Sequence, residues 1–159
     1  MNKTVHYFKT YDWAKEVGFS DEDAKKIAFS NWQIDIRKPG KRYERGRHLN
    51  TNLLSLLNGK PTQLWYMTYE LSKAIRESNL ECLGRSIHSL QDWIGHGNWP
   101  MYGFHWKGPW RFKIFGQKIA LRKYDPDSDF SEGRLEKLEL LTKDLLNIYL
   151  EATRNQSKT

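Results

Sequence analysis

Two imidazoles and a carboxylate recur at four-residue intervals within one short stretch of the chain, residues 87–97. His88, Asp92 and His96 occupy positions i, i+4 and i+8, so on an α-helix they lie within roughly 80° of one another. Neutral imidazole nitrogens and carboxylate oxygens are the ligands that zinc and similar transition-metal ions accept. The spacing therefore predicts a metal site on one face of a helix.

The apolar residues of the same stretch favour a second interpretation. They form a stripe almost diametrically opposite the His/Asp positions, made of Leu83, Ile87, Leu90 and Ile94. Polar residues opposite such a stripe are ordinarily solvated. The small neighbours indicate a different surrounding, because poor helix formers allow another helix or a ligand to approach closely. These neighbours are Gly84, Ser86, Ser89, Gly95 and Gly97.

The hydrophobic pattern predicts a mainly α protein, a single-domain helical bundle over residues 1–159, and the His/Asp spacing predicts a metal cleft within it. Helices are expected over residues 10–18, 21–34, 48–58, 61–78, 81–96 and 131–152. Residues 97–124 form an irregular segment rich in Trp and Gly, with short strands around residues 111–121. Inward positions are expected at Leu64, Met67, Leu71 and Ile75, and later at Leu135, Leu138, Leu141, Leu145, Ile148 and Tyr149.

The charge balance favours anionic partners. Twenty-six basic and 19 acidic residues give a net charge of +7, which suits nucleic acid, phospholipid headgroups or phosphate esters. Six basic residues lie within residues 37–47, among them Arg42 and Arg45, which are candidates for substrate binding. A second basic segment, residues 107–123, is interleaved with aromatic residues and follows Trp106, another candidate. Each segment is also compatible with an ordinary solvated basic surface.

Cysteine content and hydropathy bear on location. The single cysteine, Cys82, cannot form an intrachain disulfide and is expected to be a small packing residue. The chain has no apolar run near the length of a membrane span, and its start does not have the pattern of a secretory signal peptide. We expect a cytoplasmic protein, or one exported without a classical signal peptide.

The order of histidines and aspartates along the chain resembles that of a known superfamily. His6, Asp35 and His48 precede the His88-x-x-x-Asp92-x-x-x-His96 helix. This order is similar to the zinc-dependent phospholipase C and single-strand nuclease superfamily, and to bacterial toxin domains with a His-x-x-Gln-Asp-x-x-x-His helix. The resemblance covers about residues 5–100. It implies an all-helical fold with a cluster of up to three zinc ions in a cleft.

Carried over by position, the resemblance implies a first ion bound by Asp35, His48, His88 and Asp92. Asp92 would bridge to a second ion shared with His6. The remaining helix residue, His96, would belong to a third site.

The chain departs from the family pattern at two places. The family uses an N-terminal tryptophan at its second site, whereas no tryptophan precedes Trp13 here. The third site normally adds a later histidine and an acidic residue one turn on, but Pro109 stands four residues after His105. We therefore expect one or two zinc ions, with three as the upper limit.

The chemistry that such a cluster suits is phosphodiester hydrolysis. Asp35 is the candidate to accept a proton from the attacking water, and Asp92 is the alternative. Arg85 and Trp93, on the motif helix, are candidates for substrate binding, with an Arg85–Glu81 ion pair as the alternative for the arginine.

The sequence thus predicts a metal-dependent phosphodiester hydrolase, phospholipase C-like, of the kind used as a bacterial toxin or effector with an immunity protein as partner. The alternatives are a nuclease of the same superfamily and a non-catalytic nucleic-acid-binding protein with a structural metal site. A helical interaction module without metal is a third alternative.

Overall fold

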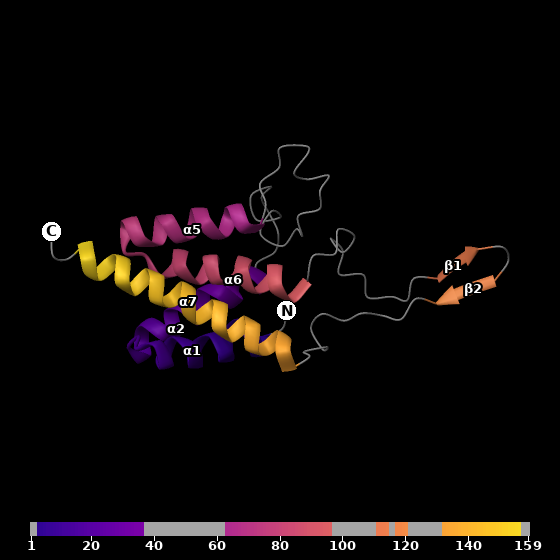
Figure 1. The fold of residues 1–159 in the computed structure, drawn as a ribbon, viewed down its shortest axis with the longest axis horizontal. Coiled ribbons are helices and arrows are strands. Elements are labelled where there is room, and N and C mark those ends of the chain that lie inside the picture. Colours follow the sequence, from indigo (N-terminus) through magenta and orange to yellow (C-terminus); the bar gives the residue numbers. More distant parts are fainter. Residues whose placement is uncertain (1–2, 37–62, 97–110, 115–116, 121–131, 157–159) are drawn as a thin grey trace.

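The structure, a computed structural model, describes residues 3–36, 63–96, 111–114, 117–120 and 132–156. Its helices pack side by side in one bundle, and the C-terminal helix runs diagonally across the N-terminal ones (Figure 1). The fold is therefore mainly α, as the hydrophobic pattern predicts.

The N-terminal part contains a π-helix that the sequence did not predict. This segment, η1 (Thr4–Lys9), continues without a break into α1 (Thr10–Val17). Helix α1 ends at Gly18, whose φ of 108° is a conformation that glycine adopts without strain. Helix α2 (Asp21–Ile36) begins after Ser20, whose hydroxyl accepts a hydrogen bond from the Asp23 amide at 3.1 Å.

The other helices also match their predicted ranges to within a few residues. They are α5 (Gln63–Glu77), α6 (Leu80–His96) and α7 (Glu132–Gln156). Asn79 is the N-cap of α6, because its side-chain oxygen accepts hydrogen bonds from the amides of Glu81 and Cys82. No described helix combines the length and the apolar character that a membrane span requires. The predicted helix over residues 48–58 lies outside the described residues.

Short strands occur where the sequence predicted them. Strands β1 (Arg111–Ile114) and β2 (Gln117–Ala120) pair as an antiparallel hairpin, with Arg111 opposite Ala120. The rest of the irregular segment over residues 97–124 lies outside the described residues.

Helix α6 is the central element of the bundle, packed against α2, α5 and α7. Its apolar stripe lies in the core, where Leu83 and Ile87 are fully buried. His88 and Asp92, on the other side of the same helix, are buried as well. The interpretation of these two residues as a solvated face is therefore wrong, because neighbouring helices cover α6 on both sides.

Two residues predicted to face the core are instead exposed. Leu64 lies near the start of α5. The buried positions of this helix include Tyr66 and Ala74 instead. Ile148 lies about 100° around α7 from buried Tyr149, at the margin of the apolar face. Both corrections are modest rotations of the predicted buried face rather than changes of the helices themselves.

The close approach of α6 to α2 depends on Gly84. A Cβ atom at this position would lie 2.4 Å from the carbonyl oxygen of Ile27 and 2.8 Å from the Cβ of Ser30. The backbones can approach this closely only because residue 84 has no side chain. Gly84 therefore allows the close helix packing that its type predicted.

We expect Gly84→Ala to lower the free energy of unfolding by about 1–3 kcal/mol, because the added methyl group meets backbone atoms that cannot move aside. Gly133→Ala is the matched control: it adds the same atom in open space on α7 and should stabilise the protein by about 0.5 kcal/mol. Urea denaturation of both variants measures the difference. Equal effects would contradict the importance of the α2–α6 contact.

Candidate metal centre

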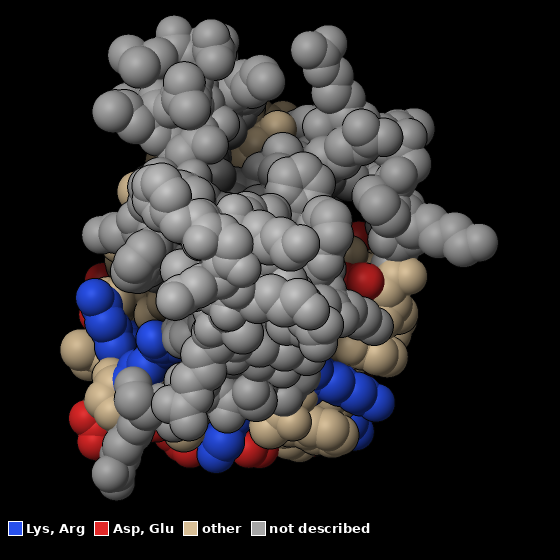
Figure 2. Space-filling model, turned by 90° about the vertical axis from the view of Figure 1, so that its right-hand side faces the viewer, with Lys and Arg blue, Asp and Glu red and all other residues tan. Residues whose placement is uncertain are grey.

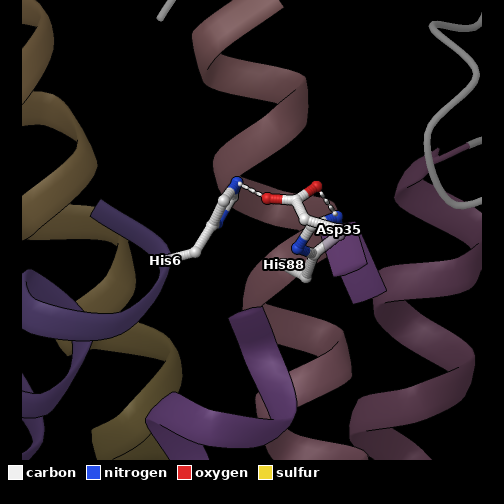
Figure 3. Close-up of side chains that lie close together, drawn as sticks. All are labelled: His6, Asp35 and His88. Atoms are coloured by element: carbon white, nitrogen blue, oxygen red, sulfur yellow. Dashed lines mark ion pairs between the residues drawn. The ribbon is translucent and has the colours of Figure 1, made fainter. Parts of the chain in front are cut away.

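Four of the six predicted ligands come together between η1, α2 and α6. Figure 3 shows His6, Asp35 and His88 converging from these three elements, and their ligand atoms all lie within 4.8 Å of one another. Asp92 joins them from the next turn of α6. Its Oδ1 lies 3.4 Å from His6 Nε2, and its Oδ2 lies 3.3 Å from His88 Nε2.

Asp35 spans the two imidazoles in the same way as Asp92. Its Oδ2 lies 3.5 Å from His6 Nε2 and its Oδ1 lies 3.8 Å from His88 Nε2. The two imidazole rings are 4.4 Å apart between centroids, with their planes tilted by 31°. Each carboxylate therefore faces both histidines, and the two Nε2 atoms point into one shared space.

The four residues, hereafter the His/Asp cluster, differ in burial. The side chains of His6 and His88 are 0 % exposed and that of Asp92 is 2 % exposed, whereas that of Asp35 is 25 % exposed. Asp35 belongs to the last turn of α2, which places it near the surface. The cluster therefore lies inside the bundle, and Asp35 is its contact with solvent.

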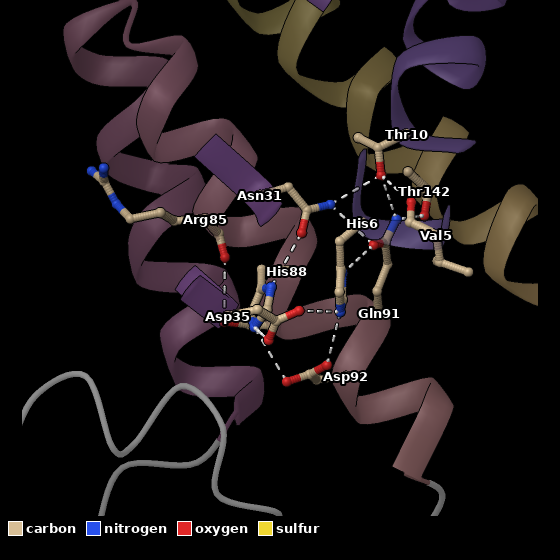
Figure 4. A network of polar contacts seen from close by, with 11 residues as sticks. Val5, His6, Thr10, Asn31, Asp35, Arg85, His88, Gln91, Asp92 and Thr142 are labelled. Atoms are coloured by element: carbon tan, nitrogen blue, oxygen red, sulfur yellow. Dashed lines mark hydrogen bonds and ion pairs between the residues drawn. The ribbon is translucent and has the colours of Figure 1, made fainter. Parts of the chain in front are cut away.

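The second nitrogen of each imidazole is held by a buried side-chain amide (Figure 4). His6 Nδ1 lies 2.9 Å from Gln91 Oε1, and His88 Nδ1 lies 3.2 Å from Asn31 Oδ1. An amide oxygen only accepts hydrogen bonds, so both Nδ1 atoms are donors. In a neutral ring Nε2 then carries a lone pair. His6 Nε2 indeed makes no hydrogen bond with a described residue.

Burial also affects the charge of His88. Removal from water lowers the pKa of His88 from its ordinary value of 6.5, although the nearby Asp92 carboxylate acts in the opposite direction. His88 is therefore neutral at pH 7. A neutral Nε2 lone pair facing buried carboxylate oxygens is unfavourable unless a cation lies between them.

The spacing of the donor atoms fits a small divalent cation. Two ligand atoms at typical zinc distances and a tetrahedral angle are about 3.3 Å apart. The four nitrogen–oxygen separations are 3.3, 3.4, 3.5 and 3.8 Å. Imidazole nitrogens whose other ring nitrogen donates to an oxygen are the usual form of histidine ligands. The residues present therefore suit zinc or a similar ion.

Several predicted site residues are not brought into the cluster. His48, Arg42, Arg45 and Trp106 lie outside the described residues. His96 is the last residue of α6, and its side chain is not described. Trp93 is half-buried and packs against the hydrophobic core, so its part in substrate binding stays a prediction.

Arg85 has a structural partner that the sequence did not predict. Its Nε donates to Oε2 of buried Glu70 at 3.0 Å, while the expected ion pair with Glu81 is longer, at 3.9 Å. Figure 4 shows the Arg85 side chain directed away from the His/Asp cluster. The charge of Arg85 is balanced within the α5–α6 contact, and its part in substrate binding stays a prediction.

Gln91, Asn31 and Thr10 are the site residues that sequence reasoning missed. The sequence pattern includes Gln91 only as part of the His-x-x-Gln-Asp-x-x-x-His motif and gives no role to Asn31 or Thr10. All three side chains are fully buried. The available signal was a polar residue at a position that helical periodicity assigns to the core, because such residues require partners.

Comparisons with known proteins give no match. No family model, no curated protein and no solved structure is similar to the chain. The resemblance to zinc-dependent phospholipases C and nucleases therefore stays a prediction.

The metal-free protein should lose stability in mild acid. Because the pKa of His88 is lower in the folded protein than the ordinary 6.5, the unfolded chain binds more protons below that pH. The free energy of unfolding should therefore be constant above about pH 6.5 and fall below it, with a slope approaching about 1.4 kcal/mol per pH unit.

Urea denaturation of chelator-treated protein at intervals between pH 7.5 and 5.5 measures this slope. His88→Gln removes the titrating group and should give a shallower dependence over the same range. An identical slope in the variant would show that His88 is not responsible.

Proposed function

We propose that the protein is a metal-dependent phosphodiester hydrolase whose ion, zinc or a similar divalent cation, is bound by the His/Asp cluster. The observation that carries the proposal is the pair of buried Nε2 atoms of His6 and His88, which face two carboxylates at 3.3–3.8 Å.

The charge of the cluster supports a cation. Two carboxylates share an interior space with neutral His88, and only one of them reaches solvent. Leaving a carboxylate buried without compensation costs several kcal/mol. A divalent ion balances two negative charges and gives the imidazole lone pairs a ligand to bind.

The arrangement is compatible with one ion or with two. In the first case His6, Asp35 and His88, whose ligand atoms all lie within 4.8 Å of one another, surround a single cation, and Asp92 lies beside both imidazoles. In the second, each imidazole binds its own ion and the two carboxylates bridge the pair, because each carboxylate presents one oxygen to each histidine. His48 and His96 remain candidates for further ligands.

The chemistry assigns different roles to the two carboxylates. A divalent ion at the cluster would lower the pKa of the water bound to it and neutralise negative charge on the phosphate oxygens. Asp35, whose side chain is partly exposed, can accept a proton from an attacking water at the edge of the site. Asp92 is enclosed beside both imidazoles and serves to hold and orient.

A phosphodiester substrate is supported by charge. The six basic residues of segment 37–47 begin two positions after Asp35, and the whole chain has a net charge of +7. On the face drawn in Figure 2, the described basic and acidic side chains are mixed along the lower border. Within the proposal, the cluster binds the reacting phosphate, and the basic residues that follow Asp35 in the sequence are candidates for further phosphate contacts.

A second candidate is a structural metal site in a non-catalytic protein that binds nucleic acid. The observation in its favour is the burial of His6, His88 and Asp92, because structural ions are usually enclosed by their ligands. Both candidates require the same ion, and they differ in whether Asp35 leaves a coordination position open to solvent.

Protein purified without added metal should contain one or two divalent ions per chain by elemental analysis. Asp92→Asn should remove most of this metal, because it replaces a buried charged ligand with a neutral one of the same shape. Asp144→Asn makes the same change at an exposed position on α7 and should leave the metal content unchanged. A content near zero, unaltered after reconstitution with zinc, would overturn the proposal.

The same preparations should hydrolyse a phosphodiester only when metal is bound. Phosphatidylcholine vesicles, single-stranded DNA and RNA are incubated separately with metal-loaded wild type, Asp35→Asn and Asp144→Asn. Cleavage by wild type that falls at least about 100-fold in Asp35→Asn supports its role as base. Bound metal without cleavage of any substrate would favour the structural site.

A further inference from the structure

The buried polar side chains behind the histidines form one connected network. Figure 4 shows Thr10 from α1, Asn31 from α2 and Gln91 from α6 meeting behind the two imidazoles. We infer that these three residues are positioning residues that fix both imidazoles in the tautomer with Nδ1–H, and so keep both Nε2 atoms ready for a cation. The inference rests on the proposed metal site and concerns how the chain prepares it.

Thr10 determines the direction of the network. Its hydroxyl donates to the carbonyl oxygen of Val5 at 3.1 Å, and a backbone carbonyl only accepts. Having donated its one proton, the Thr10 oxygen can only accept from the groups that approach it. Two amide groups do so at 3.0 Å, those of Asn31 and Gln91, and each must therefore present its nitrogen.

The orientation of each amide then follows without ambiguity. Asn31 Nδ2 donates to Thr10 and to Gln91 Oε1, so Asn31 Oδ1 faces His88. Gln91 Nε2 donates to Thr10 and to Thr142 Oγ1, so Gln91 Oε1 faces His6 and Asn31. Turning either amide by 180° would set two donors or two acceptors against each other.

The orientation of the two amides in turn determines which ring nitrogen of each histidine carries the proton. Since Oε1 of Gln91 and Oδ1 of Asn31 only accept, each imidazole must carry a proton on Nδ1 to hydrogen-bond with its amide. The alternative tautomer would place that proton on Nε2, where the carboxylates of Asp35 and Asp92 can accept it. A proton there would occupy the position that a cation needs.

The network thus decides between two outcomes that the cluster alone allows. Without the network, the histidine protons would lie on Nε2 and hydrogen-bond to the carboxylates, so no Nε2 lone pair would remain for a cation. With it, the protons are directed away from the carboxylates, and the cluster keeps its affinity for a cation. Loss of a side chain that hydrogen-bonds the second nitrogen of a metal-binding imidazole typically lowers metal affinity by 10- to 100-fold.

The tautomers can be measured in the metal-free protein. Long-range proton–nitrogen correlation spectra of nitrogen-15-labelled wild type, recorded with chelator at pH 7.5, distinguish Nδ1–H from Nε2–H for each histidine. We expect Nδ1–H for both His6 and His88. Nε2–H as the main form of either residue overturns the inference, whether or not the protein hydrolyses anything.

The variant Gln91→Leu tests whether Gln91 holds the His6 proton on Nδ1. Leucine keeps most of the side-chain volume but offers no acceptor to His6, so the His6 proton should move to Nε2, next to the carboxylates. His88 should keep Nδ1–H, because Asn31 is still oriented by Thr10. Zinc affinity, measured by competition with a chelator, should fall by about 10- to 100-fold.

Thr142→Val is the matched control and Gln91→Glu is the conservative rescue. Thr142 only accepts from Gln91 at 3.3 Å, so its loss removes one buried hydrogen bond without releasing the amide from Thr10. Its His6 tautomer and its zinc affinity should stay as in wild type. With its buried carboxyl group protonated, Gln91→Glu keeps an O–H donor toward Thr10 and an acceptor beside His6, so it should also keep Nδ1–H.

If Gln91→Leu folds with His6 still protonated at Nδ1, or binds zinc as tightly as Thr142→Val, Gln91 is only a packing residue and the inference is wrong. If Gln91→Leu does not fold, the wild-type and Gln91→Glu spectra decide. Absence of any metal binding in wild type, with both tautomers as expected, would instead count against the proposed function alone.

Discussion

The structure depends on keeping two carboxylates and two histidines together inside a helical bundle. Groups of this kind leave water only when charge and hydrogen-bonding capacity are matched. Asp92 is enclosed between the imidazoles of His6 and His88, and Asp35 closes the set from the surface side. The helices that surround the cluster are therefore arranged around a chemical requirement for positive charge as well as around an apolar core.

Helix α6 meets both requirements because it is buried on two opposite sides. One side supplies Leu83 and Ile87 to the apolar core, and the other supplies His88 and Asp92 to the cluster. Such a helix needs neighbours that approach closely on the polar side. Gly84 permits this approach to α2, which brings Asn31 and Asp35 within reach of the histidines.

The sequence predicted the part of this site that depends on local spacing. His88 and Asp92 are one helical turn apart, and that relation survives whatever the helix packs against. Bringing in His6 and Asp35 required a resemblance, since nothing local relates the N-terminal segment to α6. No local pattern encodes the π-helix around His6, and the orientation of the Gln91 amide depends on partners from other helices. The same reason explains Arg85, whose partner Glu70 lies on α5.

Because the ligands come from η1, α2 and α6, an ion at the cluster would link three elements that are distant along the chain. Binding energy would then contribute to folding, since the unfolded chain offers no assembled site. The hydrogen bonds that link Thr10 to the amides of Asn31 and Gln91, and these amides to the imidazoles, would work in the opposite sense, because they hold lone pairs toward carboxylates before an ion arrives. A site prepared in this way would be less stable when empty, and it would therefore favour a cation over a proton at the two Nε2 atoms.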